Sequence, residues 1–270
     1  MAERGVKHSS RSWREAVGVY RNRRVIGMMF LGFSAGLPFL LVFSTLSAWL
    51  RAEEISRAAI GFFSWVGITY SIKVFWAPIV DRVPLPMLTP ALGRRRSWML
   101  CAMIGIALGL LGMAGVNPTE NLHGVALCAL LVAFSSATQD ISIDAYRIEA
   151  VEREFQGAMA ATYQLGYRIA LLVAGGGALV LADATSWAFS YSAMACLTLV
   201  GITTVLTIRE PEIPGHSVEP LNGAKNWFVM AVVRPFVDFF ERNGRLALLI
   251  LLFVGLFRIS DILMGVMANP

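Results

Sequence analysis

Two carboxylates inside an apolar stretch are the most chemically informative feature of the sequence. Asp140 and Asp144 follow Ser136 at four-residue intervals, and Arg147 comes three residues later. On a helix these positions share one face. A carboxylate that faces lipid costs between ~2.5 and ~17 kcal/mol, so such groups normally face a bundle interior or a water-filled cavity. The pattern therefore predicts a polar interior in which Asp140 can exchange a proton.

Other polar residues within apolar stretches supply partners for these carboxylates. At ~1.5 Å per residue, Lys73 and Asp140 lie at a similar depth and are expected to be able to pair. The residues expected to line a substrate and proton pathway are Lys73, Gln139, Asp140, Tyr163, Gln164, Tyr167, Arg168, Arg258 and Asp261. A permanent ion pair with Lys73 is the alternative for Asp140. Arg258 and Asp261, one turn apart, can also neutralise each other.

Composition indicates an integral membrane protein. Hydrophobic residues make up 56% of the 270 residues and charged residues only 15%, against ~25% charged in a typical soluble domain. The net charge of +5 agrees with basic cytoplasmic loops, so no nucleic-acid partner is expected. The three cysteines lie in apolar stretches without paired spacing, so neither a disulfide nor a metal site is expected, and no cofactor is implied.

Apolar runs predict seven membrane spans. They are residues 25–50, 59–80, 97–116, 123–144, 155–181, 185–208 and 245–267. Lysines and arginines concentrate in residues 1–24 and in the second, fourth and sixth connections, whereas the outer connections hold only Arg51 and Arg57. This asymmetry places the N-terminus in the cytoplasm. The stretch from Trp227 to Phe240 is too short and broken to span, and is expected to be an amphipathic helix at the cytoplasmic interface.

Small residues within the spans indicate where helices approach closely. Gly32 and Gly36 have a close-packing spacing, and Gly105, Gly109, Gly112 and Gly115 suit a second contact. Pro38 removes a backbone donor near mid-membrane and is expected to kink the first span. The kink at Gly36 and Pro38 serves either packing alone or a hinge or cavity-lining role.

The distribution of the buried charges has a specific architectural meaning. Spans two, four, five and seven each contain at least one ionisable residue, whereas spans three and six contain none. The pattern resembles the major facilitator architecture, in which helices three and six of each half are peripheral. The expected fold is an all-α integral membrane protein. It comprises a cytoplasmic segment 1–24, a six-helix bundle 25–208, a cytoplasmic loop 209–243, and residues 244–270 as the first helix of a second half.

Several motifs together resemble the AmpG-type muropeptide permeases of this superfamily. They are GFSAGLP at 32–38, GFFS at 61–64, KVFWAP at 73–78, LGRRR at 92–96, ATQD at 137–140, DAYR at 144–147, LGYR at 165–168 and VRPF at 233–236. The resemblance implies proton-driven import of N-acetylglucosaminyl-anhydro-N-acetylmuramyl peptides across the bacterial inner membrane. It also implies a place in peptidoglycan recycling and beta-lactamase induction.

The connection between spans two and three resembles the general facilitator loop. Asp81 and Arg82 precede it, and Arg94 and Arg95 end it. The resemblance implies a gating role for these residues, together with the charges at the cytoplasmic helix ends, Asp144 and Arg147. A simple salt bridge at the end of the helix is the alternative for Asp144 and Arg147.

Members of the resembled family have twelve or more spans, so the chain is expected to be a fragment whose C-terminal half is its natural partner. A facilitator for another small solute, of siderophore, drug or acyl-CoA type, stays open. Asp140 and Asp144 also resemble the magnesium-binding carboxylates of intramembrane prenyltransferases, but that chemistry needs a second aspartate-rich segment, which the sequence lacks. A membrane adaptor would leave the charged lining unexplained.

Overall fold

The computed structural model describes residues 18–211, 233–253 and 256, and these residues contain helices and no strand. The chain divides into two compact units, Met1–His216 and Ser217–Pro270. The first unit contains the elements η1 (Val19–Arg21), α2 (Arg23–Val42), α3 (Ser44–Ala52), α4 (Arg57–Phe63), η2 (Ser64–Gly67), α5 (Ile68–Ile72), η3 (Lys73–Phe75), α6 (Ala77–Arg82), α7 (Leu88–Leu92), α8 (Arg94–Ala114), α9 (Leu122–Glu149), η4 (Arg153–Phe155), α10 (Gln156–Leu172), η5 (Val173–Gly177), α11 (Ala178–Ala184) and α12 (Trp187–Thr207). The second contains α14 (Arg234–Asn243) and a helical stretch at 246–253.

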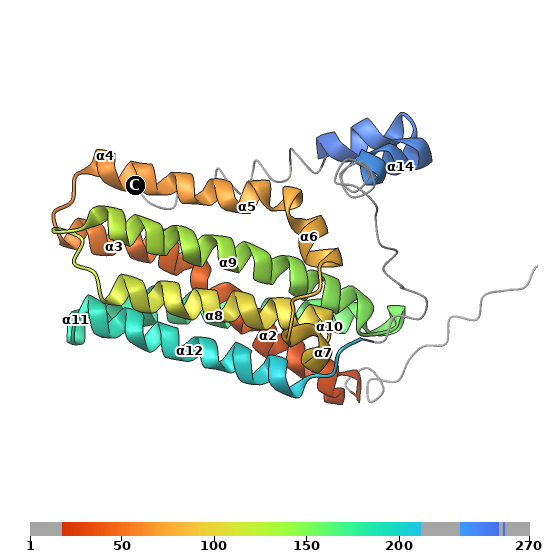
Figure 1. Cartoon of the computed structure of the whole chain (residues 1–270), viewed down its shortest axis with the longest axis horizontal. Helices are drawn as coiled ribbons and strands as arrows, with labels where there is room; N and C mark the ends of the chain where they lie inside the picture. Colours follow the sequence, from red (N-terminus) through yellow and green to blue (C-terminus); the bar gives the residue numbers. More distant parts are fainter. Residues whose placement is uncertain (1–17, 212–232, 254–255, 257–270) are drawn as a thin grey trace, which may run out of the picture. The chain divides into compact units, whose positions relative to one another are not determined.

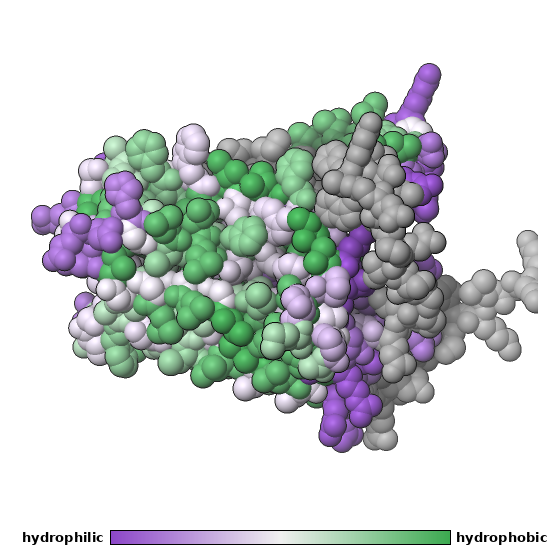
Figure 2. All heavy atoms as spheres, in the orientation of Figure 1, coloured by the Kyte–Doolittle hydropathy of each residue, from purple (hydrophilic) through white to green (hydrophobic). Residues whose placement is uncertain are grey.

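Five helical stretches of the described chain are long and apolar enough to cross a membrane. They are Arg23–Ala52, Arg94–Ala114, Leu122–Glu149, Arg153–Ala184 and Trp187–Thr207. In Figure 1 they run side by side through the first unit, and Figure 2 shows apolar side chains along this bundle with hydrophilic ones gathered toward its ends. The expected all-α membrane fold is confirmed.

Polar caps explain where several of these helices begin. The side chain of Asn22 accepts a hydrogen bond from the Arg24 amide, 2.9 Å away, and Asn121 accepts one of 2.8 Å from Gly124 N. Ser186 accepts a longer bond, 3.2 Å, from Phe189 N. Each side-chain oxygen satisfies a backbone amide that the first turn of a helix leaves without a partner, so α2, α9 and α12 have defined starts.

Glycines bring the helices of the bundle into close contact, as their spacing predicts. A Cβ at Gly32 or Gly36 of α2 would collide with the α10 backbone at Tyr163 or Tyr167, and one at Gly166 of α10 would collide with Met29 O. On α8, a Cβ at Gly105, Gly109 or Gly112 would meet Ser135, Val132 or Cys128 of α9. The α2–α10 and α8–α9 contacts therefore depend on residues without a side chain.

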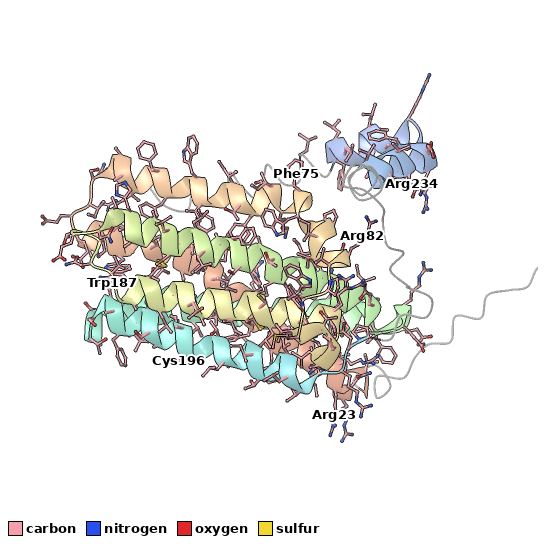
Figure 3. All side chains as sticks on the ribbon, viewed as in Figure 1. Arg23, Phe75, Arg82, Trp187, Cys196 and Arg234 are labelled. Carbon is pink, nitrogen blue, oxygen red and sulfur yellow. The ribbon has the colours of Figure 1, made fainter. Side chains whose placement is uncertain are left out.

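The segment 57–82, the expected second span, is assembled from short pieces. It contains α4, η2, α5, η3 and α6, with a turn at Trp76 and Pro78 inside the first turn of α6. Large apolar side chains on it, Phe62, Trp65 and Phe75, are more than 60% exposed. Contacts with α9 hold this segment to the bundle. Figure 3 shows Phe75 and Arg82 on its last pieces.

The first span is interrupted at Phe43. Pro38 lies inside α2, and the break between α2 and α3 falls at Phe43, whose φ of −116° and ψ of −95° are not helical. The break at Phe43 was not predicted, and the kink expected at Pro38 stays a prediction. A second irregularity, the π-helical η5, spans Val173–Gly177 in the fifth span, where three consecutive glycines tolerate a locally widened helix.

Several boundaries differ from those expected. The fourth span continues as α9 to Glu149, so Arg147 belongs to a helix and not to a loop. The interfacial helix, α14, begins at Arg234 and ends at Asn243; residues 227–232 of the expected range lie outside the described residues. Arg258 and Asp261 also lie outside the described residues, so their predicted role stays a prediction.

Candidate functional site

The central feature of the bundle interior is a contact between the segment 57–82 and α9. Lys73 Nζ donates a hydrogen bond to Asp140 Oδ2 at 3.4 Å. The two side chains are 34% and 22% exposed, so the pair is neither fully buried nor fully solvated. The contact is the one that the similar depth of the two residues predicts, and its length leaves it weaker than a short charge-assisted hydrogen bond.

Aromatic hydroxyl groups surround this pair. Tyr70 lies three residues before Lys73. Its hydroxyl group is close to Ser136 and Asp140 of α9 and to Tyr167 of α10. Tyr163 and Tyr167 of α10 lie with their ring centroids 6.2 Å apart. These side chains give the polar interior a set of neutral hydrogen-bonding groups beside one cation and one anion.

The Asp144 end of the same α9 face has its own contacts. Arg147 Nη2 lies 3.4 Å from Asp144 Oδ1, and the Arg147 guanidinium carbon lies 6.0 Å from the centroid of the Tyr163 ring. The salt bridge that was the alternative for Asp144 and Arg147 is therefore present. A cation over an aromatic face adds a modest attraction, so Arg147 links α9 to α10.

Three predicted pathway residues are placed differently from the central pair. Gln139 is fully buried, and its Nε2 donates to Ser34 Oγ of α2 at 2.9 Å, an interaction between helices. Gln164 and Arg168 are exposed and make no hydrogen bond or ion pair with the described residues. They lie about 100° around α10 from Tyr163 and Tyr167. The predicted roles of all three in a pathway stay predictions.

A second group of charges, the Arg95 cluster, comprises Asp81, Arg95 and Glu149 at one end of the bundle. Arg95 donates from Nε to Glu149 Oε2 at 2.9 Å, from Nη2 to Glu149 Oε1 at 2.5 Å, and from Nη1 to Asp81 Oδ1 at 2.5 Å. The Arg95 side chain is only 7% exposed. This bidentate grip connects α6, α8 and α9.

Backbone caps extend the Arg95 cluster to the segment after α12. Glu210 accepts hydrogen bonds from the amides of Arg95 and Arg96, at 2.7 and 3.1 Å. The guanidinium of Arg96 donates to Val205 O at 2.7 Å and to Leu206 O at 2.9 Å. An anion thus stabilises the start of α8 and a cation the end of α12, in the sense that helix dipoles favour.

Gly93 allows this arrangement at the start of α8. Its φ of +87° suits glycine, and a Cβ there would collide with the Glu210 side chain.

Some of the predicted gating residues contact one another in the structure, and residues that were not predicted contact them as well. Asp81 and Arg95 are brought together, while Arg82 ends α6 (Figure 3) and Arg94 begins α8. Sequence reasoning missed Glu149, Glu210 and Tyr70. Only Tyr70 had a local signal, because it lies three residues before Lys73 on the same helical face. Glu149 and Glu210 lie 54 and 115 residues from Arg95.

The arrangement suits reversible binding of ions and polar solutes. Within the described residues, no group of three or more histidine, cysteine, aspartate or glutamate side chains is placed to hold a metal ion. The central pair offers a cation and a proton-accepting carboxylate in a partly solvated interior. Such groups inside a membrane typically mark an ion or substrate pathway.

Comparison with known families distinguishes between the alternatives that the sequence left open. The model of the Major Facilitator Superfamily matches residues 28–268. The chain belongs to this superfamily. This membership agrees with the predicted all-α, multi-pass membrane protein.

Curated relatives narrow the position within the superfamily. Over 254 residues the chain is 34% identical to the putative transporter AmpG 4 of Rickettsia conorii, covering 93% of the chain and 60% of the relative. It is 38% identical over 244 residues to the anhydromuropeptide permease of Escherichia coli K12, covering 90% of the chain and 47% of the relative. The chain thus spans about half to three fifths of these relatives, and the resemblance to AmpG-type proteins is confirmed.

Proposed function

We propose that the chain forms the first part of a proton-driven importer of anhydro-muropeptides. Similarity to a relative named anhydromuropeptide permease supports the substrate class. The chemistry of the interior supports it too, since a sugar-peptide with free carboxylates needs cations and hydroxyl or amide groups in a wet cavity. The candidate groups are Lys73, Tyr163, Gln164, Tyr167 and Arg168.

The proposal includes a place and an orientation. The protein lies in the bacterial inner membrane with its N-terminus in the cytoplasm, because basic residues concentrate in residues 1–24 and in alternate connections. Residues 25–208 form the six-span bundle, residues 209–243 form a cytoplasmic loop, and residues 244–270 begin a second half. The greater length of the relatives supports a second half that completes the pathway.

The observation that carries the coupling proposal is the 3.4 Å contact between Lys73 and Asp140. While Lys73 is adjacent, Asp140 stays ionised, because an opposite charge favours the charged form. A substrate carboxylate that attracts Lys73 leaves Asp140 without its cation, and a poorly solvated carboxylate binds a proton more readily. Proton and substrate binding then become linked, which symport requires.

Uptake by the full-length protein in membrane vesicles tests this coupling. Asp140→Asn keeps the shape of the side chain but fixes a neutral state, so accumulation of labelled anhydro-muropeptide driven by an imposed pH gradient is expected to fall to the level without a gradient. Downhill exchange is expected to persist. Asp144→Asn, closer to the end of α9, is the matched control and should lose less. If Asp140→Asn responds to the gradient as the unmodified protein does, Asp140 is only an ion-pair partner.

Recognition of the substrate carboxylate has its own test at Arg168. Arg168→Lys is expected to lower uptake roughly tenfold at equal protein in the membrane, since lysine loses the planar fork that binds a carboxylate bidentately. Uptake at the unmodified rate removes Arg168 from the substrate site. If the protein accumulates a siderophore, drug or acyl-CoA-type solute and no muropeptide, it is a facilitator for another small solute.

A further inference from the structure

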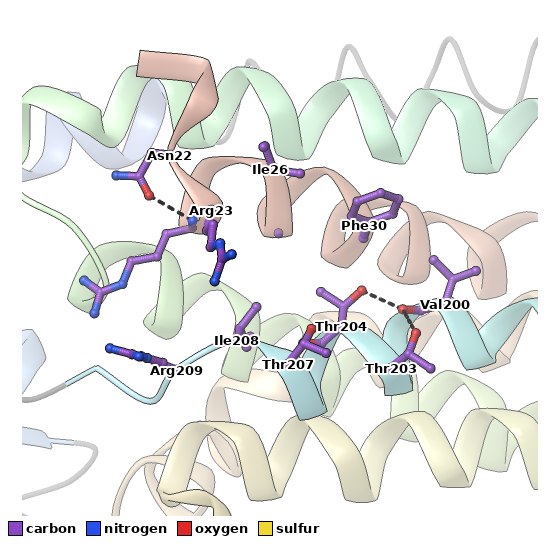
Figure 4. A pocket seen from close by; sticks show the side chains of 12 residues that line it. Asn22, Arg23, Ile26, Phe30, Val200, Thr203, Thr204, Thr207, Ile208 and Arg209 are labelled. Carbon is purple, nitrogen blue, oxygen red and sulfur yellow. Dashed lines mark hydrogen bonds between the residues drawn. The ribbon is translucent and has the colours of Figure 1, made fainter. Parts of the chain in front are cut away.

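A groove of about 890 Å³ lies between the start of α2 and the end of α12. Its lining residues belong neither to the Lys73–Asp140 pair nor to the Arg95 cluster. Figure 4 shows α2 and α12 as its two walls, with Arg23 and Arg209 at one end and Phe30 and Val200 toward the other. The groove therefore has a basic end and an apolar body, and neither is used by the proposed transport mechanism.

The basic end holds three arginines whose charges are largely uncommitted. Arg23 and Arg209 are exposed and make no side-chain hydrogen bond or ion pair with the described residues. Arg24 donates from Nη1 to the carbonyl of Ala150. The neighbouring carboxylate, Glu210, accepts hydrogen bonds from the backbone amides of Arg95 and Arg96 in the first turn of α8. This end of the groove therefore attracts an anion.

The end of α12 does not need these arginines as caps. Arg96 of α8 donates to the carbonyls of Val205 and Leu206. The helix-terminal carbonyls that Arg209 would otherwise serve are thus satisfied from the other side. No described side chain pairs with the guanidinium groups of Arg23 and Arg209, which leaves their donors available to a ligand.

The body of the groove is more apolar than its composition suggests. Ile26 and Phe30 are about two fifths exposed along the α2 wall. On the α12 wall, the hydroxyls of Thr203 and Thr204 both donate to Val200 O, and that of Thr207 donates to Thr204 O. With the hydroxyls bonded to their own helix, the threonines leave their methyl groups to line the surface.

We propose that this groove binds an anionic phospholipid, with its phosphate at Arg23, Arg24 and Arg209 and an acyl chain along the apolar body. Phe30 is seven residues from Arg23, about 10 Å along the helix, so the apolar wall continues from the basic end in the direction that a lipid tail follows. Basic pockets between membrane helices bind anionic headgroups in this way. A free phosphate ion would use the arginines alone and leave the apolar wall uncovered.

The proposed orientation would place this end of α2 and α12, and the bound lipid, in the cytoplasmic leaflet. That assignment rests on the proposed orientation, whereas the lipid site itself does not. Binding of lipid is measured without transport, so a failure of the muropeptide proposal leaves this inference standing, and the reverse also holds.

Native mass spectrometry of the full-length protein in detergent, titrated with phosphatidylglycerol or phosphatidylcholine, tests the site. The unmodified protein is expected to retain phosphatidylglycerol preferentially. The double variant Arg23→Gln/Arg209→Gln is expected to bind it about thirtyfold more weakly, as the loss of two arginines near a membrane surface implies. The control Arg51→Gln/Arg153→Gln removes the same charge away from the groove and should keep the preference.

A second variant separates lipid from free anion. Thr203→Trp fills the apolar body while leaving the arginines in place, and is expected to weaken phosphatidylglycerol binding as strongly as the double variant does. Unchanged binding in Thr203→Trp, or displacement of the lipid by equimolar glycerol phosphate, overturns the proposal in favour of simple anion binding. Equal losses in the double variant and its charge control also overturn it.

Discussion

The bundle contains two groups of opposite charges with different geometry. In the Arg95 cluster one almost fully buried guanidinium makes three hydrogen bonds of 2.5 to 2.9 Å to two carboxylates. In the central pair, Lys73 makes a single contact of 3.4 Å with Asp140, and both side chains stay partly exposed. The geometry of the Arg95 cluster suits holding helices together. The geometry of the central pair leaves Lys73 and Asp140 able to separate and bind other partners.

The two groups of charges also lie on elements that differ in how firmly they pack against the bundle. Arg95 lies on α8, a continuous helix in close glycine contact with α9. Lys73 lies on the segment 57–82, whose helical pieces are short and whose large apolar side chains are exposed. Local opening is easiest where few apolar contacts are buried. The comparison separates a charge cluster whose geometry suits stabilising the bundle from a pair whose geometry suits the proposed coupling.

The largest expected effect is at Arg95. Arg95→Gln removes the cation that binds Glu149, whose side chain is only 18% exposed, so the free energy of unfolding should fall by about 3 to 5 kcal/mol. Chemical denaturation of the purified protein in detergent measures this loss. Arg51→Gln, at an exposed position, is the control and should change it by less than about 0.5 kcal/mol. A loss at Arg95 no larger than that of the control would erase the distinction between the two groups.

The next effect separates the two carboxylates of the Arg95 cluster. Glu149 accepts two of the hydrogen bonds and is 18% exposed, whereas Asp81 accepts one and is 44% exposed. Glu149→Gln should therefore cost about 1.5 to 3 kcal/mol of unfolding free energy, and Asp81→Asn less than about 1 kcal/mol. Both are read from the same denaturation curves. The reverse order would mean that the α6 contact, and not the α9 contact, anchors the start of α8.

At the central pair, stability and transport should respond differently. Asp140→Asn is expected to lower the unfolding free energy by less than about 1 kcal/mol, because a partly exposed, long ion pair contributes little. The same variant is expected to lose gradient-driven uptake. Chemical denaturation and vesicle uptake, measured on one preparation, check the expected stability and the expected loss of uptake. A stability loss as large as that of Arg95→Gln would make the central pair a structural ion pair.

The smallest effect is expected at Asp144. Its carboxylate is 54% exposed and lies 3.4 Å from Arg147, three residues away on the same helix. Such pairs contribute about 0.2 to 0.5 kcal/mol and weaken in salt. Asp144→Asn should therefore change unfolding little, and the change should vanish at high ionic strength. A larger change that persists in salt would show that Asp144 takes part in a buried ion pair, as Arg95 does.

Much of the fold could be predicted because membrane helices are coded locally. Apolar runs bounded by charges indicated the helices α2, α8, α9, α10 and α12, since every backbone polar group in a bilayer must be satisfied within the helix. The spacing of Gly32 and Gly36 indicated a close contact, although not that Gly166 of α10 supplies the facing surface. Depth along the spans predicted the contact of Lys73 with Asp140.

The positions of irregularities were harder to predict. The break between α2 and α3 falls at Phe43, where no proline or glycine marks it in the sequence, and the kink expected at Pro38 stays a prediction. Gln139 illustrates the same limit. The sequence did not indicate that its side chain would donate to Ser34 of α2, and its role in a pathway stays a prediction.

The sequence by itself determined the membrane class, the helices and the presence of a polar interior, because hydropathy and the cost of a lipid-facing charge act on each segment alone. Only the tertiary structure decided which charges meet. Arg95 is joined to residues 14, 54 and 115 positions away, and the groove between α2 and α12 unites residues from the two ends of the bundle's sequence. Those partners depend on helix packing, since a long side chain pairs with whatever the neighbouring helix brings within reach.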